Sequence, residues 1–269
     1  MAGASDNILG LKTIFDATTC TRKGLCPVTR IRNQVETFES HSLYYEIHGN
    51  INAPEKLVFI MGLNSSSFAW LSQVQHFGRL SEYSILVFDN RGVGHSGVPR
   101  GPYTTSGMAE DAIVLLDYLG WTVKRDFHVV GISLGGMIAQ ELATRIPERI
   151  ASLTLAVTTP GGHPWSNLPP WKGFISLAKL TFTTDINLKI PLILDMVYPR
   201  RWLDEPAEDD NEGRTNREVQ TEGYRHRILI TAPQHFLGSL SQMAAALTHN
   251  VDFQRLRDIS ETIPKVLIL

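Results

Sequence analysis

The pentapeptide Gly131-Ile132-Ser133-Leu134-Gly135 contains a serine with a glycine two positions away on each side. It follows an apolar run at 126–132 and precedes an amphipathic run at 134–146, so we predict a tight turn between a strand and a helix. A residue at the tip of such a turn has a strained backbone, and its neighbours must be small to avoid collision. The pattern indicates a nucleophilic serine. The alternative is a glycine-rich turn with an incidental serine.

Four apolar runs of strand length, at 56–61, 83–88, 126–132 and 151–157, alternate with helical patterns. This order predicts right-handed crossovers and a mostly parallel sheet, which is the α/β fold class. Upstream, an alternation of apolar and polar residues predicts an antiparallel hairpin that pairs Val35–Phe38 with Leu43–Ile47. We therefore expect an N-terminal extension at 1–29 and the first part of the core at 30–159.

The alternation stops after Thr159, where a segment rich in Pro, Gly and Trp begins. Helix-like stretches follow at 171–182, 186–198, 215–230 and 233–248, and the next buried-strand pattern is at 265–269. This interruption predicts a helical cap at 160–250, inserted into the core. Residues 251–269 are then the start of the second part of the core, which ends in a seventh strand.

The composition is that of a globular protein, with 43% hydrophobic and 19% charged residues among 269. The net charge of −2 provides no electrostatic case for binding nucleic acid or an anionic membrane. No apolar run approaches the ~20 residues of a membrane span, and residues 1–29 lack the apolar core of a signal peptide. These features predict a soluble, cytoplasmic protein.

The chain has two cysteines, Cys20 and Cys26, for which a reduced pair is favoured and a disulfide stays open. Its nine histidines form no cluster with cysteine at metal-binding spacing. We therefore expect neither a metal nor another cofactor.

Two further motifs accompany the serine turn. Residues 89–96 read DNRGVGHS, and residues 61–64 read MGLN. Along the chain the three motifs stand at 61–64, 89–96 and 131–135. With the motifs in this order, the sequence resembles the α/β-hydrolase superfamily over about residues 30–269, in the branch with a helical cap between the sixth and seventh strands. The first motif is similar to the D-x-R-G-x-G-x-S loop after the fourth strand. The second stands where members carry a His-Gly oxyanion loop, and Met61 departs from that histidine.

The resemblance implies that Ser133 is the nucleophile, with the backbone N–H groups of Leu134 and Leu63 as the oxyanion hole. Asn64 is expected either to add a side-chain donor or to cap its loop. The implied activity is that of a serine hydrolase, acting on a carboxylic ester or related acyl compound through an acyl-enzyme.

Aromatic residues of the predicted cap suggest a small hydrophobic acyl substrate. Trp165, Trp171 and Phe174 form an apolar cluster that either lines an acyl pocket or is the core of the cap. The sequence does not decide between these two readings.

A serine nucleophile needs a histidine base that a carboxylate holds in place. In the resembled family the acid usually follows the seventh strand and the histidine follows the eighth. Residues 264–269 (PKVLIL) look like the seventh strand, so the resemblance implies that residues 1–269 stop before the acid, the histidine and the closing helix. The alternative function is therefore a catalytically incompetent, truncated chain that retains at most a small-molecule pocket. Such a chain is expected to be poorly soluble and nearly inactive.

Overall fold

The computed structural model describes residues 10–31, 39–168, 171–183, 185–208 and 210–269. The chain divides into two compact units, one formed by residues 1–167 with 234–269 and the other by residues 168–233. The described part contains no helix that combines the length and the apolar character needed to cross a bilayer.

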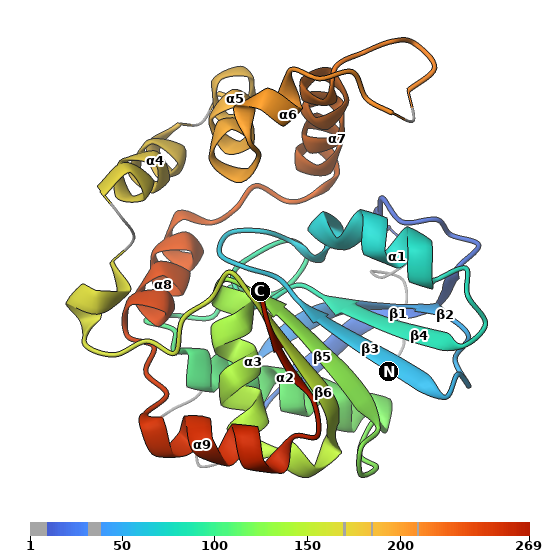
Figure 1. The fold of residues 1–269 in the computed structure, drawn as a ribbon, viewed down its shortest axis with the longest axis vertical. Coiled ribbons are helices and arrows are strands. Elements are labelled where there is room, and N and C mark those ends of the chain that lie inside the picture. The colour runs from blue at the N-terminus through green and yellow to red at the C-terminus, as the bar shows by residue number, and fades with distance from the viewer. Residues whose placement is uncertain (1–9, 32–38, 169–170, 184, 209) are drawn as a thin grey trace. The chain divides into compact units, whose positions relative to one another are not determined.

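The first unit is built on one seven-stranded sheet in the order β1-β2-β4-β3-β5-β6-β7 (Figure 1). Parallel pairing runs from β4 through β3, β5 and β6 to β7, while β1 with β2 and β2 with β4 are antiparallel. The predicted α/β sheet with an N-terminal antiparallel hairpin is confirmed. The strands are β1 (Cys20–Val28), β2 (His41–Gly49), β3 (Glu55–Ile60), β4 (Tyr83–Phe88), β5 (Phe127–Ile132), β6 (Ile150–Ala156) and β7 (Val266–Ile268).

The hairpin differs from the prediction in its first strand. Leu43–Ile47 lies within β2 as expected, but its partner in the structure is β1, and the predicted partner Val35–Phe38 lies outside the described residues. The sheet therefore begins inside the expected extension at 1–29. Charged residues and Pro27 hide the strand pattern of β1. An edge strand tolerates such residues because one side of its backbone has no partner strand.

Helices of the first unit pack on both faces of the sheet (Figure 1). They are α1 (Leu71–Phe77), α2 (Thr105–Leu119), α3 (Leu134–Arg145), α8 (Phe236–Leu247) and α9 (Phe253–Thr262). The buried faces of α2 and α3 carry Ile113, Leu116, Ile138 and Leu142, which join the main core with the central strands. Helix α2 ends at Leu119, and its C-cap residue Gly120 has the left-handed φ of 77° that favours glycine.

The second unit is helical. It contains α4 (Trp171–Phe182), α5 (Ile186–Val197), α6 (Arg200–Leu203) and α7 (Asn216–Ile230), with a small core of Ile190, Leu194 and Leu203. Helices thus occur at all four predicted stretches. The compact unit is nevertheless narrower than the expected cap at 160–250, because α8 belongs to the first unit and buries Gln242 and Ala245 there. The function of the second unit as a cap stays a prediction.

Candidate active site

Ser133 lies between β5 and α3, at the predicted turn. Its φ of 53° and ψ of −121° form a backbone conformation that residues with a side chain rarely adopt. The peptide is fixed on both sides: its N–H donates to the carbonyl of Ala156 at 2.9 Å, and its carbonyl accepts from the N–H of Gly136 at 2.9 Å and the hydroxyl of Thr158 at 2.8 Å. The residue is exposed. A strained, rigidly held serine is therefore open to a reactant.

The glycines around Ser133 allow backbone segments to approach closely. A Cβ atom at Gly131 would lie 2.4 Å from the carbonyl oxygen of Gly135, and one at Gly135 would lie 2.1 Å from that of Ile60. A Cβ atom at Gly136 would lie 2.6 Å from the Cβ atom of Thr158. These distances are too short for any side chain, which confirms that the turn requires small neighbours.

The loop after β3 lies against the serine. A Cβ atom placed on Gly62 would be 3.3 Å from the Cβ atom of Ser133 and 3.8 Å from its Oγ. Leu63 follows directly, and Leu134 is the first residue of α3, where backbone N–H groups have no partner within the helix. The predicted oxyanion residues thus flank Ser133, although their role as donors stays a prediction.

Helix α8 holds this loop in place. Asn64 has a left-handed φ of 56°, and its backbone N–H donates to Oε1 of Gln242 at 2.9 Å. Its side chain donates to the hydroxyl of Ser239 at 2.8 Å and accepts from Gln234 at 2.6 Å. Fully buried Gln242 also donates to the carbonyl of Arg91 at 2.8 Å. These contacts match the loop-capping alternative for Asn64, while its predicted contact with substrate stays untested.

No sequence pattern identifies Gln242 as the residue that bonds the loops after β3 and β4. The stretch that contains it was expected in the cap, whereas in the structure it lies against the loops that follow β3 and β4. The hydrogen bond to Asn64 joins residues 178 positions apart. Such a contact depends on the tertiary fold and has no local sequence pattern.

Asp89 stabilises the loop after β4. Both carboxylate oxygens of Asp89 accept backbone N–H groups, from Ser67 at 2.7 Å and His95 at 2.8 Å. Complete burial raises the pKa of Asp89. Arg91 instead reaches α2, where it pairs with Asp111 at 2.5 Å.

The three aromatic residues predicted to bind substrate are not brought together by any described contact. Trp165 has 70% of its surface exposed and stacks on His163, with ring centroids 4.6 Å apart. Trp171 and Phe174 belong to α4 in the second unit, and their side chains lie outside the described part of the structure. Their predicted role stays a prediction.

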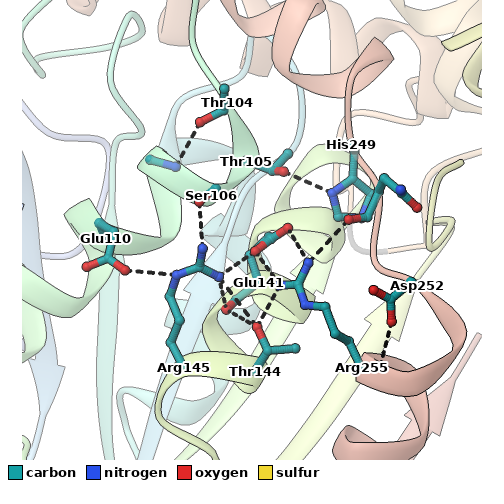
Figure 2. A network of polar contacts seen from close by, with 12 residues as sticks. Thr104, Thr105, Ser106, Glu110, Glu141, Thr144, Arg145, His249, Asp252 and Arg255 are labelled. Carbon is teal, nitrogen blue, oxygen red and sulfur yellow. Dashed lines mark hydrogen bonds and ion pairs between the residues drawn. The ribbon is translucent and has the colours of Figure 1, made fainter. Parts of the chain in front are cut away.

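A polar network behind the site ties α3 to its neighbouring helices. Figure 2 shows Glu141 of α3 between Arg145 and Arg255. Arg255, on α9, donates to Glu141 at 2.6 Å, and Arg145 also pairs with Glu110 of α2 at 2.8 Å. Burial raises the pKa of Glu141, but hydrogen bonds from Arg255 and Arg145 outweigh it and hold that pKa below its usual value. The network fixes α3, the helix that begins directly after Ser133.

Several histidine rings of the first unit contact groups other than Ser133. His128 is half-buried and bonds Glu55 and Ser152, each at 2.7 Å. His249 is buried, with Nδ1 2.9 Å from the hydroxyl of Thr105. Others bond Asp111 (His41), Thr19 (His48) and the carbonyl of Lys12 (His95).

Comparison with known proteins agrees with this architecture. A family model described as alpha/beta hydrolase fold matches residues 56–186. A protein of Azorhizobium caulinodans named "Putative carbamate hydrolase RutD" is 35% identical over 113 residues, which are 42% of this chain and 40% of the relative. A protein of the same name from Caulobacter segnis is 28% identical over 241 residues, which are 78% of this chain and 86% of the relative.

A solved structure of a hydrolase from Pseudomonas aeruginosa superimposes with a TM-score of 0.61 at 22% identity, covering 91% of this chain and 89% of its own. At this identity the likeness concerns the fold alone. Together with the sheet order and the serine turn, these matches show that the chain has the α/β-hydrolase fold.

Proposed function

We propose that this protein is a serine hydrolase that cleaves a carboxylic ester or a related acyl compound through an acyl-enzyme on Ser133. The observation that carries the proposal is the strained conformation of an exposed serine at the start of α3, with the loop after β3 against it. Strain of this kind is retained where the surrounding structure fixes it, and it clusters at functional sites. A carbamate, to which the names of the sequence relatives refer, is itself an acyl compound.

The proposed reaction has two halves. Ser133 Oγ attacks the carbonyl carbon and gives its proton to a base, while the carbonyl oxygen becomes an oxyanion that accepts hydrogen bonds from the N–H groups of Leu63 and Leu134. Collapse of this tetrahedral species expels the protonated leaving group and leaves an ester on Ser133. Water then attacks that ester, loses a proton to the same base, and releases the carboxylic acid and the free serine.

A second candidate is a non-catalytic protein that keeps a small-molecule pocket. It is favoured by the histidine contacts described above, because those rings bond groups other than Ser133. The predicted position of the triad acid and histidine beyond Leu269 stays a prediction. The decisive experiment therefore compares the 269-residue chain with any longer product of its gene.

The test measures hydrolysis of p-nitrophenyl acetate and covalent labelling by a fluorophosphonate, which reacts with activated serines. In a competent enzyme, Ser133→Ala abolishes both signals, leaving at most the residual rate that a hydrolase keeps after loss of its nucleophile. Ser81→Ala is the matched control because Ser81 is exposed and lies before β4, and among the described residues its hydroxyl bonds Glu82 alone. If folded proteins of both lengths were neither labelled nor active, this would contradict the proposal and favour the binder.

A further inference from the structure

A cluster of potential metal ligands lies on the hairpin of β1 and β2, outside the serine site. Cys20, Glu46 and His48 each direct one ligand atom into a region where these atoms all lie within 4.8 Å of one another. The pairing of the strands creates this cluster, because Cys20 stands opposite His48 in the β-ladder and Glu46 is two residues before His48 on the same face of β2. The side chains of Glu46 and His48 are completely buried, while Cys20 is half-buried.

Hydrogen bonds outside the cluster determine which nitrogen of His48 faces it. The hydroxyl of Thr19 donates its proton to the carbonyl of Asp16 at 2.9 Å. The same oxygen lies 2.9 Å from Nδ1 of His48, so it accepts a proton from that nitrogen. Neutral His48 therefore carries its lone pair on Nε2, which points toward Glu46. Metal-binding histidines commonly have an outer hydrogen bond of this kind.

The two oxygens of the Glu46 carboxylate also differ in their contacts. Oε1 accepts the hydroxyl of Tyr44 at 2.7 Å, whereas Oε2 and the facing Nε2 of His48 are buried atoms without a hydrogen-bond partner. Two buried acceptors that face each other with no donor between them are unfavourable unless a cation lies there. An imidazolium would supply a proton, but charge-assisted hydrogen bonds are ~2.7–2.9 Å long. The separation of Oε2 from Nε2 is 3.3 Å.

This separation suits a tetrahedral metal. Zinc bonds of ~2.0 Å to oxygen and ~2.05 Å to nitrogen, at the tetrahedral angle, place the two ligand atoms about 3.3 Å apart. A thiolate, an imidazole and a carboxylate are the three ligand types that zinc accepts. We infer that Cys20 Sγ, Glu46 Oε2 and His48 Nε2 bind one Zn²⁺, with the fourth position occupied by water that enters beside half-buried Cys20.

The zinc site is separate from the serine site. Two strands, β4 and β3, lie between β2 and β5, so the site is roughly 14 Å across the sheet from the strand of Ser133. The metal links the first residue of edge strand β1 to the end of β2. It thereby fastens to β2 an edge strand that has a partner strand on only one side.

The test begins with the whole chain, stripped with EDTA under reducing conditions. Zn²⁺ is titrated in competition with a chromophoric chelator, and Co²⁺ is titrated as a spectroscopic substitute. We expect one equivalent of zinc, a rise in Tm on loading, and a thiolate-to-cobalt charge-transfer band together with the visible bands of a four-coordinate ion.

Three variants locate the site. Cys20→Ala removes a ligand on the half-buried side, so it is expected to lose the charge-transfer band. Its affinity for zinc should fall more than ~100-fold, which exceeds the loss of affinity that an outer-shell change causes. Thr19→Val removes the outer hydrogen bond to His48 and weakens binding about 10-fold. Cys26→Ala is the control. Cys26 is on the same strand and free, but it lies outside the cluster, so this variant retains both signals.

Circular dichroism of each stripped variant establishes that it is folded. Equal zinc affinity of the wild-type and Cys20→Ala chains would overturn the inference, as would a cobalt spectrum without the charge-transfer band. The cluster would then be a buried imidazolium–carboxylate pair.

Discussion

Lowering the pH through the range in which a free histidine gains a proton tests the environment of His249. This residue is 1% exposed, its Nδ1 bonds the hydroxyl of Thr105, and its Nε2 has no hydrogen-bond partner in the described structure (Figure 2). Burial lowers the pKa of His249 from 6.5 to about 4. The charge of Glu141 acts in the opposite direction but does not compensate.

The sign of the effect follows from proton binding. Between pH 6.5 and about 4 the unfolded chain binds a proton at His249 that the native state does not. The free energy of unfolding must therefore fall as the pH falls through this window. One pKa unit corresponds to about 1.4 kcal/mol, so His249 alone removes about 2 kcal/mol by pH 5 and about 3 kcal/mol once the pH is below its native pKa.

Urea unfolding of the wild-type and His249→Asn chains at several pH values, from about pH 7.5 to about pH 5, measures this term. Asparagine keeps a polar group near the hydroxyl of Thr105 but removes the titration. As the pH falls from about 7.5 to about 5, the free energy of unfolding should decrease by about 2 kcal/mol less in the variant than in the wild type. This difference does not depend on the stability of the variant at about pH 7.5. His76→Asn controls for the loss of one imidazole, since His76 is exposed on α1. Parallel pH profiles for the wild type and His249→Asn would refute the reasoning.

Three substitutions, two of them with a matched control, test how the site is held in place. Glu141→Gln leaves two arginines without their carboxylate and should lower the free energy of unfolding, measured with urea, by about 3 kcal/mol. The control Glu148→Gln changes an exposed carboxylate and should lower it by less than about 1 kcal/mol. Gly135→Ala places a Cβ atom 2.1 Å from a backbone oxygen of β3 and should prevent a native melting transition, while Gly223→Ala, with nothing within 4 Å in helix α7, should stabilise by up to ~1 kcal/mol. If the proposed function holds, Gln242→Leu frees the loop after β3 and lowers kcat about 10- to 100-fold, and unchanged kcat in a folded variant would contradict this.

The sheet could be predicted where burial leaves an unbroken apolar sequence. β3, β4, β5 and β6 are central strands covered on both faces, so each appears as a continuous apolar run. β1 has one strand neighbour and contains Arg22, Lys23 and Pro27, so its pattern is lost. Helix α8 was found at its sequence position, but its place in the first unit could not be inferred. Its amphipathic pattern does not specify which partner covers it.

The same distinction applies to the site. The serine turn was predictable because steric requirements act between residues two or three positions apart, and these leave glycines in the sequence. The contact of Gln242 with Asn64 and the grouping of Cys20 with His48 depend on long-range pairing, for which a single sequence carries no periodic signal. Zinc spacing in particular is recognised from ligands close in sequence, and here the ligands are joined by the register of a hairpin.

Two glutamines, one before α8 and one within it, bind the candidate oxyanion loop. The second unit ends at Pro233, and the next residue, Gln234, donates to the side chain of Asn64 at 2.6 Å. Two turns further on, Gln242 binds the backbone N–H of the same asparagine. Gln234 and Gln242 therefore both hold the loop that lies against Ser133. Because Asn64 follows Leu63, these hydrogen bonds act one residue from the proposed oxyanion donor, and all of them lie within the first unit.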